Sequence, residues 1–151
     1  MNRRDFLVAI LASTAPAVWA SAATREIWSA DEAFNALTKN TISMIDVRSR
    51  QEWLETGIAK GAWPISMHEG EFQRRLFAAH ELSGQKSVAL ICATGGRSAS
   101  LLNALKRARF TGFIDVSEGM LGSHRGPGWI ARGLPIVELK IALANLPQEL
   151  R

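Results

Sequence analysis

The stretch SVALICATGGRSASLLNALKRAR, residues 87–109, joins the clearest strand of the chain to its clearest helix through a short turn. Residues 87–91 are small or β-branched, which is typical of a short strand buried on both faces. Residues 98–109 are expected to form a helix, because apolar residues recur on one face: Leu101, Leu102, Leu105 and Ala108. A strand that passes directly into a helix predicts a βα unit, the repeating element of a parallel sheet.

The same alternation of strand and helix continues on both sides of this stretch. Short apolar runs of strand length lie at residues 42–47, 62–65 and 113–116. Helical spacing is found at residues 31–38, 50–54 and 69–80. The sequence SADE at residues 29–32 is a capping box that would begin the first of these helices. Alternating strands and helices predict an α/β fold with a mostly parallel sheet that is covered by helices on both faces.

The first 22 residues have the layout of a signal peptide. A basic start is followed by an apolar run and by the small residues Ala20, Ser21 and Ala22, which suit a signal peptidase. The run is short for a membrane span, which needs ~20 residues. Arg3 and Arg4 also resemble a twin-arginine signal. We therefore expect export to the bacterial periplasm with cleavage after Ala22. Cleavage after Ala20, the general export route, an uncleaved anchor and a buried N-terminal helix are the alternatives.

The remainder is expected to form one domain with a short extension. A chain of 151 residues can build one core, and 47% hydrophobic and 21% charged residues exclude disordered and fibrous classes. We place the domain at residues 27–137. Residues 138–151 are expected to be a helical extension packed on it, because one helical stripe precedes Pro147: Ile136, Leu139, Leu143 and Leu146.

Charge and histidine positions exclude several kinds of site. The formal net charge is +4, and the basic residues form no clustered stripe, so we expect no nucleic-acid binding and no membrane binding after signal cleavage. A modest positive field suits a small anionic substrate, although solvated surface charges would give the same balance. His68, His80 and His124 lie far apart, and no Cys/His spacing is that of a metal site, so no metal is expected.

Cys92 is the single cysteine and directly follows the strand at residues 87–91. In an exported protein it cannot form an internal disulfide, so it is inert, paired with another molecule, or chemically used. The turn after a strand of a parallel sheet lies at the carboxyl edge, where active sites form. Gly95 and Gly96 let backbone N–H groups converge, and the next helix adds its positive end, so a sulfur anion would be stabilised. A buried core cysteine is the alternative, but it would not need the Gly-Gly-Arg-Ser continuation.

Motifs along most of the chain resemble those of the rhodanese-like superfamily. The loop CATGGRSA at residues 92–99 is similar to the active-site loop of that family. IDVR at residues 45–48, followed by EW at 52–53 and GIAKGA at 57–62, resembles its N-terminal signature. VSEG at residues 116–119, GW at 128–129 and GLP at 133–135 resemble its C-terminal part. The chain is therefore identified as a member of this family, as a single-domain exported sulfurtransferase.

The resemblance implies a three-layer fold with a five-stranded sheet and a sulfurtransferase reaction. Cys92 would take sulfane sulfur from a donor such as thiosulfate, hold it as a persulfide, and pass it to cyanide or another thiophilic acceptor. The backbone N–H groups of the loop would cradle this sulfur: Ala93, Thr94, Gly95, Gly96, Arg97 and Ser98. Arg97 would hold the loop or face an anionic substrate. Asp46 and Arg48 match the family's Asp-x-Arg and would form a structural ion pair near the site. No cofactor is implied beyond the covalent persulfide.

Loop length separates this chain from its nearest rivals, and two positions depart from the family pattern. Four residues lie between Cys92 and Arg97, whereas phosphatases and arsenate reductases on related folds have five, so the loop favours sulfur. Ile58 stands where many members have His, and Ala93 stands where many have Arg or Lys, which removes positive charge that thiosulfate would use. His124 and Arg125 in a long loop at residues 121–129 would replace that charge if the loop overhangs the site; an ordinary surface loop is the alternative.

Three functions are consistent with these residues. The first is a catalytic sulfurtransferase with a small anionic donor and a thiophilic acceptor. The second is a persulfide carrier that serves a specific protein acceptor and uses thiosulfate poorly. The third is a thiol-sensing or binding module, since a free thiolate in an oxidising compartment is open to sulfenic acid and mixed disulfides. The intact Cys92 and its loop favour the first.

Overall fold

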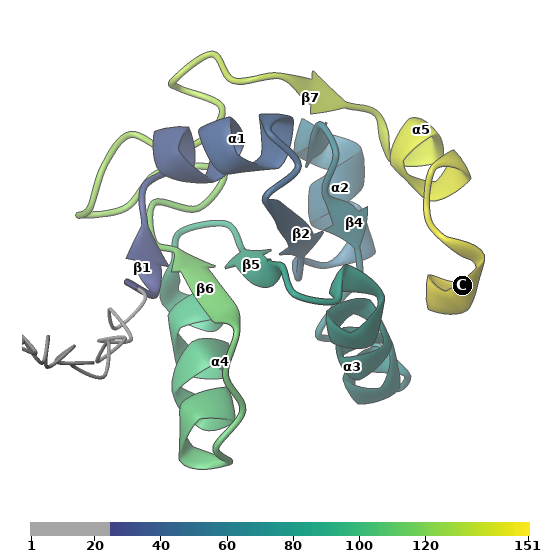
Figure 1. Cartoon of the computed structure of the whole chain (residues 1–151). Helices are drawn as coiled ribbons and strands as arrows, with labels where there is room; N and C mark the ends of the chain where they lie inside the picture. Colours follow the sequence, from purple (N-terminus) through teal and green to yellow (C-terminus); the bar gives the residue numbers. More distant parts are fainter. Residues whose placement is uncertain (1–24) are drawn as a thin grey trace, which may run out of the picture.

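A computed structural model describes residues 25–151, and its centre is a five-stranded parallel sheet. The strand order is β1-β6-β5-β2-β4, which places β5 in the middle (Figure 1). These strands are β1 (Ile27–Trp28), β2 (Ile42–Asp46), β4 (Trp63–Pro64), β5 (Ser87–Ile91) and β6 (Phe113–Val116). The helices are α1 (Ala30–Thr38), α2 (Arg50–Thr56), α3 (Phe72–Ser83), α4 (Gly96–Arg107) and α5 (Leu139–Ala144), followed by a 3-10 turn at Gln148–Leu150. The expected α/β class and five-stranded sheet are confirmed.

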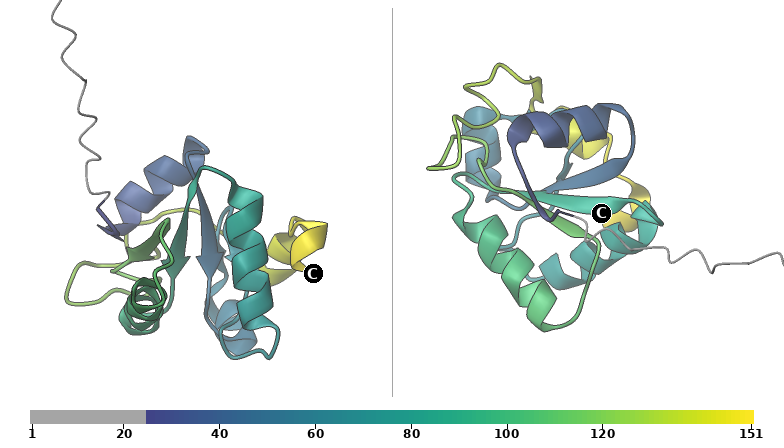
Figure 2. Two further views of the ribbon diagram at one scale, coloured as in Figure 1. Left: turned by 60° about the horizontal axis from the view of Figure 1, so that its bottom comes forward. Right: turned by 60° about the vertical axis from the view of Figure 1, so that its left-hand side comes forward.

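Helices cover both faces of the sheet, because alternate residues of each strand point to opposite sides. Ala89 and Ile91 of β5 pack in a cluster with residues of α1, α2 and α5. Val88, Leu90 and Cys92 belong to a second cluster with residues of α3 and α4. Figure 2 shows these two helical layers with the sheet between them. The alternation aims the side chain of Cys92 toward the α3 and α4 layer.

The C-terminal region differs from the sequence expectation. Ile136 lies in strand β7 (Ile136–Val137), which pairs antiparallel with β3 (Ile58–Ala59), and not in a helix. The helix α5 begins only at Leu139 and ends at Ala144. Pairing with β3 satisfies backbone groups of residues 136 and 137 from a segment far away in sequence, which a local helical pattern cannot reveal. The strands β1 and β3 have only two residues each, which is too few to show the alternation of apolar and polar residues that predicts a strand.

The N-terminal signal expected at residues 1–22 lies outside the described residues. Within residues 25–151, no helix is long and apolar enough to cross a membrane.

A buried ion pair joins β2 to the segment that follows α2. Arg48 Nη2 donates to Asp46 Oδ2 at 2.8 Å, and Arg48 Nε donates to Asp46 Oδ1 at 3.0 Å. The guanidinium also donates to Thr56 Oγ1 and to the Gly57 carbonyl, each at 2.7 Å. Both charged residues have 0% exposure, so these bonds satisfy groups that water cannot reach. The pair thereby fixes the end of α2 relative to the central sheet.

We expect Asp46→Asn to lower the free energy of unfolding by about 3–5 kcal/mol, because it leaves the Arg48 charge buried without its partner. Urea unfolding followed by circular dichroism measures this change. Glu138→Gln is the matched control, since it breaks the exposed pair with Lys140 and should leave the stability almost unchanged. Equal effects of the two substitutions would contradict the structural importance of the buried pair.

Candidate active site

Cys92 lies at the carboxyl end of the central strand and is 1% exposed. Its carbonyl oxygen accepts from Met120 N at 2.9 Å, and the Ala93 carbonyl accepts from Leu121 N at 2.8 Å. These bonds hold the loop at residues 92–98 against the segment at residues 117–121, which follows β6. The carboxyl edge of the sheet therefore carries two interlocked loops, as the βα pattern around Cys92 predicts for the first of them.

The sulfur of Cys92 accepts hydrogen bonds from the start of α4. Gly95 N donates to Cys92 Sγ at 3.1 Å, and Ser98 N lies at 3.5 Å from the same sulfur. The Ser98 hydroxyl is 3.3 Å from Sγ. The helix α4 has twelve residues, so its positive N-terminal end adds to these dipoles. Two backbone N–H groups, a hydroxyl and a helix end therefore face one sulfur, which is an arrangement that stabilises an anion.

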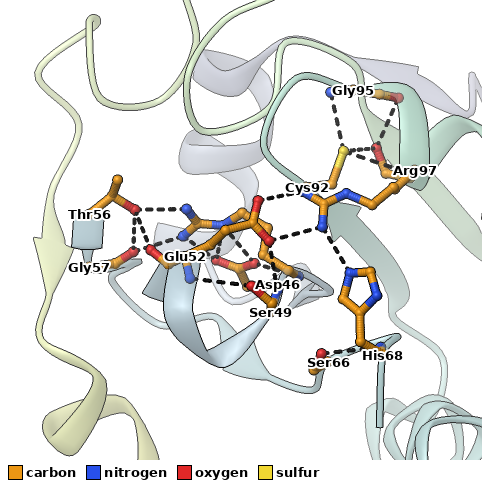
Figure 3. A network of polar contacts seen from close by, with 12 residues as sticks. Asp46, Ser49, Glu52, Thr56, Gly57, Ser66, His68, Cys92, Gly95 and Arg97 are labelled. Atoms are coloured by element: carbon orange, nitrogen blue, oxygen red, sulfur yellow. Dashed lines mark hydrogen bonds and ion pairs between the residues drawn. The ribbon is translucent and has the colours of Figure 1, made fainter. Parts of the chain in front are cut away.

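The six loop residues expected to form the cradle have different roles in the structure. Gly95 and Ser98 supply the contacts to Sγ. Ala93 is buried and contributes its carbonyl to the interlocking bond with Leu121, whereas Thr94 and Gly96 are exposed at the turn. Arg97 lies beside Cys92 in Figure 3, with its guanidinium turned toward Glu52 and His68.

Arg97 is held by Glu52 and His68. Its Nη1 and Nη2 donate to the two carboxylate oxygens of Glu52 at 2.9 and 2.5 Å. Arg97 Nη1 also lies 3.0 Å from His68 Nε2. Of the two roles expected for Arg97, this geometry favours the one that holds the loop. It also gives His68 a polar partner beside the site, where only a surface or core residue was expected.

Glu52 connects Arg97 to the start of α2. Its carboxylate accepts from Ser49 N at 2.9 Å, which completes a capping box on that helix. The hydrogen bonds from Arg97, together with that from the Ser49 backbone, lower the pKa of Glu52 to about 2 despite its partial burial. The positive charge of Arg97 is therefore balanced by Glu52 within the protein.

Asp115 of β6 lies behind the loop and was not identified from the sequence. Ser98 Oγ is 2.6 Å from Asp115 Oδ1, and the aspartate is 3% exposed. Burial raises the pKa of Asp115, although the hydrogen bond from Ser98 and the charge of Arg125 oppose that shift. The sequence offered one indication of this site, an aspartate within an apolar strand. The strand pattern could not reveal that this aspartate contacts Ser98 of α4.

The loop at residues 121–129 is anchored to the protein by Glu118. Glu118 accepts from Gly128 N at 2.9 Å and from Arg132 Nε and Nη2, both at 2.8 Å. Arg132 chiefly accounts for the lowered pKa of Glu118. Arg125 is exposed on this loop, and its charge acts on Asp115. Among residues 25–151, no group of three metal-binding side chains comes together.

The fold and the cysteine loop define an α/β protein with a sulfur site at the carboxyl edge of a parallel sheet. The sequence model described as "Rhodanese-like domain" matches residues 29–124. The chain therefore belongs to the rhodanese-like family, and the resemblance of its motifs is confirmed.

Solved structures show the same fold. The polysulfide-sulfur transferase homodimer from Wolinella succinogenes is 26% identical, with a TM-score of 0.56 over 76% of this chain and 79% of that chain. A rhodanese-like domain protein from Staphylococcus aureus is 24% identical, with a TM-score of 0.55 over 75% and 99% of the two chains. Rv0390 from M. tuberculosis is 20% identical, with a TM-score of 0.55 over 74% and 96%. A search of curated proteins found no match.

We expect Gly95→Ala to destabilise the protein and to disrupt the sulfur cradle. Gly95 has a φ of 84°, which costs about 1–3 kcal/mol for other residues, and a Cβ there would overlap the Ser117 carbonyl oxygen. Gly96→Ala is the control, because nothing lies within 4 Å of a Cβ at that neighbouring position. Urea unfolding and the rate of Cys92 alkylation by iodoacetamide report the two effects. A Gly95→Ala protein as stable and as reactive as the Gly96→Ala protein would refute the close packing.

The pair of Glu52 and Arg97 should make stability depend on pH. The pKa of Glu52 is about 2 in the folded protein, below its ordinary value of 4.5, so the pair stabilises the protein fully above pH 4.5. This stabilisation is lost as the pH falls from 4.5 toward 2, because Glu52 becomes protonated. We therefore expect Glu52→Gln to be less stable than wild type at neutral pH and to approach it in acid, by urea unfolding. Glu55→Gln, on the exposed side of α2, should show no such convergence.

Proposed function

We propose that this protein is a sulfurtransferase that carries sulfane sulfur as a persulfide on Cys92. The observation that carries the proposal is the convergence of Gly95 N, Ser98 N and the Ser98 hydroxyl on Cys92 Sγ. Membership of the rhodanese-like family and a polysulfide-sulfur transferase among the similar structures support a role in sulfur transfer. The cradle suits a sulfur anion, which is the form of the attacking thiolate and of the terminal persulfide sulfur.

The proposed reaction has two displacement steps. The Cys92 thiolate attacks the outer sulfur of the donor, so that a new S–S bond forms and the bond within the donor breaks. With thiosulfate as the donor, sulfite leaves with the bonding electron pair. A thiophilic acceptor such as cyanide then attacks the terminal sulfur of the persulfide, and the Cys92 thiolate is restored. Two-electron displacement suffices for both steps, and the covalent persulfide is the only intermediate on the protein.

Thiosulfate is the donor proposed from the family pattern, and polysulfide is the second candidate. The loop offers little free positive charge to a dianion, because Ala93 is apolar and Arg97 is paired with Glu52. The homodimer from Wolinella succinogenes, which is named as a polysulfide-sulfur transferase, is consistent with this second donor.

A persulfide carrier for a protein acceptor is the alternative function. Leu121 is 54% exposed, and its backbone N–H is bonded to the Ala93 carbonyl, so an apolar side chain stands beside the loop. Such a residue suits contact with a protein better than contact with a small anion. Export to the periplasm after cleavage near Ala22 remains part of the proposal, with a small anionic donor and a thiophilic or protein acceptor as the partners.

Intact-mass measurement tests the persulfide cycle. We expect the mature protein to gain the mass of one sulfur atom after incubation with thiosulfate, or of one or more sulfur atoms after incubation with polysulfide, and to lose this added mass on addition of cyanide. Cys92→Ser, which preserves the size of the side chain, should gain nothing. Uptake from polysulfide alone would exclude thiosulfate as the donor. No adduct from either donor would reject the sulfurtransferase and favour a binding module.

A further inference from the structure

The Ser98 hydroxyl stands between the Cys92 sulfur and a buried carboxyl group. Ser98 Oγ lies 3.3 Å from Cys92 Sγ and 2.6 Å from Asp115 Oδ1. Ser98 is 0% exposed and Asp115 is 3% exposed, so water does not compete for these contacts. The steps of the proposed function leave Asp115 unused, although it lies one side chain away from the reacting atom.

The charged groups around Asp115 do not neutralise it directly. Arg125, from the loop after β6, is exposed to solvent. Just before β1, the Glu26 carbonyl accepts from Asp115 N at 2.7 Å, and the Glu26 side chain pairs with Lys106 of α4 at 2.5 Å. At the start of α4, Arg97 pairs with Glu52. Within residues 25–151, the hydrogen bond to the Asp115 side chain therefore comes from Ser98.

A hydroxyl carries one hydrogen. Three acceptors lie near the Ser98 hydroxyl: Asp115 Oδ1 at 2.6 Å, Cys92 Sγ at 3.3 Å and the Gly95 carbonyl oxygen at 3.3 Å. When Asp115 is ionised, Ser98 donates to Oδ1, because a charge-assisted O–H bond of about 2.5–2.7 Å is the stronger one. The Ser98 oxygen then presents lone pairs to Cys92 and can accept from the thiol S–H. When Asp115 is protonated, its own O–H donates to Ser98 Oγ, and the Ser98 hydrogen is free to bind the Cys92 anion.

We propose that Asp115 is a positioning residue that holds the Cys92 proton, relayed through the Ser98 hydroxyl, while the sulfur is an anion. The thiol proton passes to Ser98 Oγ as the Ser98 hydrogen passes to the carboxylate, which yields a thiolate and a neutral carboxyl group. No proton leaves the protein and the net charge is unchanged. The inference rests on the proposed function in taking the Cys92 anion as the reactive form.

The surroundings of Asp115 and Cys92 favour the transfer of the proton from the thiol to the carboxylate. The carboxylate of Asp115 is desolvated, and burial raises its pKa. The sulfur, in contrast, faces the N–H groups of Gly95 and Ser98 at the start of α4. Moving the negative charge from Asp115 to Cys92 therefore transfers it from a site with one hydrogen bond to a site with several dipoles directed at it.

The pH dependence of Cys92 alkylation by iodoacetamide tests the proposal. Because the wild-type pair releases its two protons in succession and its singly protonated state is partly thiolate, we expect the rate to rise in two steps. Asp115→Asn removes the proton acceptor with little change of shape, so its rate should rise in one step. Ser98→Ala removes the relay and should lower the rate near neutral pH about tenfold, and leave one step.

Glu26→Gln is the control, because it removes a carboxylate from the residue whose backbone carbonyl accepts from Asp115 N, without touching the relay. It should keep both steps. A two-step profile in folded Asp115→Asn, checked by thermal unfolding, would overturn the proposal. If that variant does not fold, Ser98→Ala decides, and two steps with an unchanged rate would overturn it. Alkylation reports the Cys92 anion whether or not sulfur is transferred. A two-step profile without a sulfur adduct would therefore reject the proposed function and retain the Asp115 relay.

Discussion

The site depends on the close approach of two backbone segments at the carboxyl edge of the sheet. A Cβ at Gly95 would overlap the Ser117 carbonyl, and a Cβ at Gly119 would overlap the Ala93 carbonyl. Both glycines have positive φ, at 84° and 70°, so each also needs the backbone freedom of glycine. With no side chain between them, the segment after β6 bonds directly to the Cys92 and Ala93 carbonyls. This contact fixes the turn that aims Gly95 N at the sulfur.

Dipoles stabilise the sulfur, and the nearby charges stabilise the loops that supply those dipoles. Arg97 and Glu52 tie α4 to α2, while Arg48 and Asp46 tie the end of α2 to the sheet. Figure 3 shows Glu52 and Arg97 beside Cys92. Each arginine in the network is matched by a carboxylate. Such a site suits a singly charged sulfur better than a phosphate or another multiply charged anion.

The residues beyond the family match at 29–124 complete the domain. Ile136 and Val137 add the second sheet through β3, and Leu139 of α5 packs in the same core cluster as Trp53 and Trp129. Near the end of the chain, the Leu150 carbonyl accepts from Arg75 Nε at 2.8 Å, which docks the last turn on α3. The C-terminal segment therefore covers both core clusters around the edge of the sheet.

Local sequence alone determined the parallel α/β fold, the strand at residues 87–91 and the position of Cys92 before a glycine turn. These features follow from the spacing of apolar residues and from the positions of glycines, both of which can be read over a few neighbouring residues. The same reasoning placed Ile136 in a helix, since it could not detect pairing with a strand almost eighty residues earlier. Only the tertiary structure decided that Arg97 faces Glu52 and His68, and that Asp115 meets Ser98. Those partners lie on separate elements, and their distances are set by how helices pack on the sheet and not by any pattern along the chain.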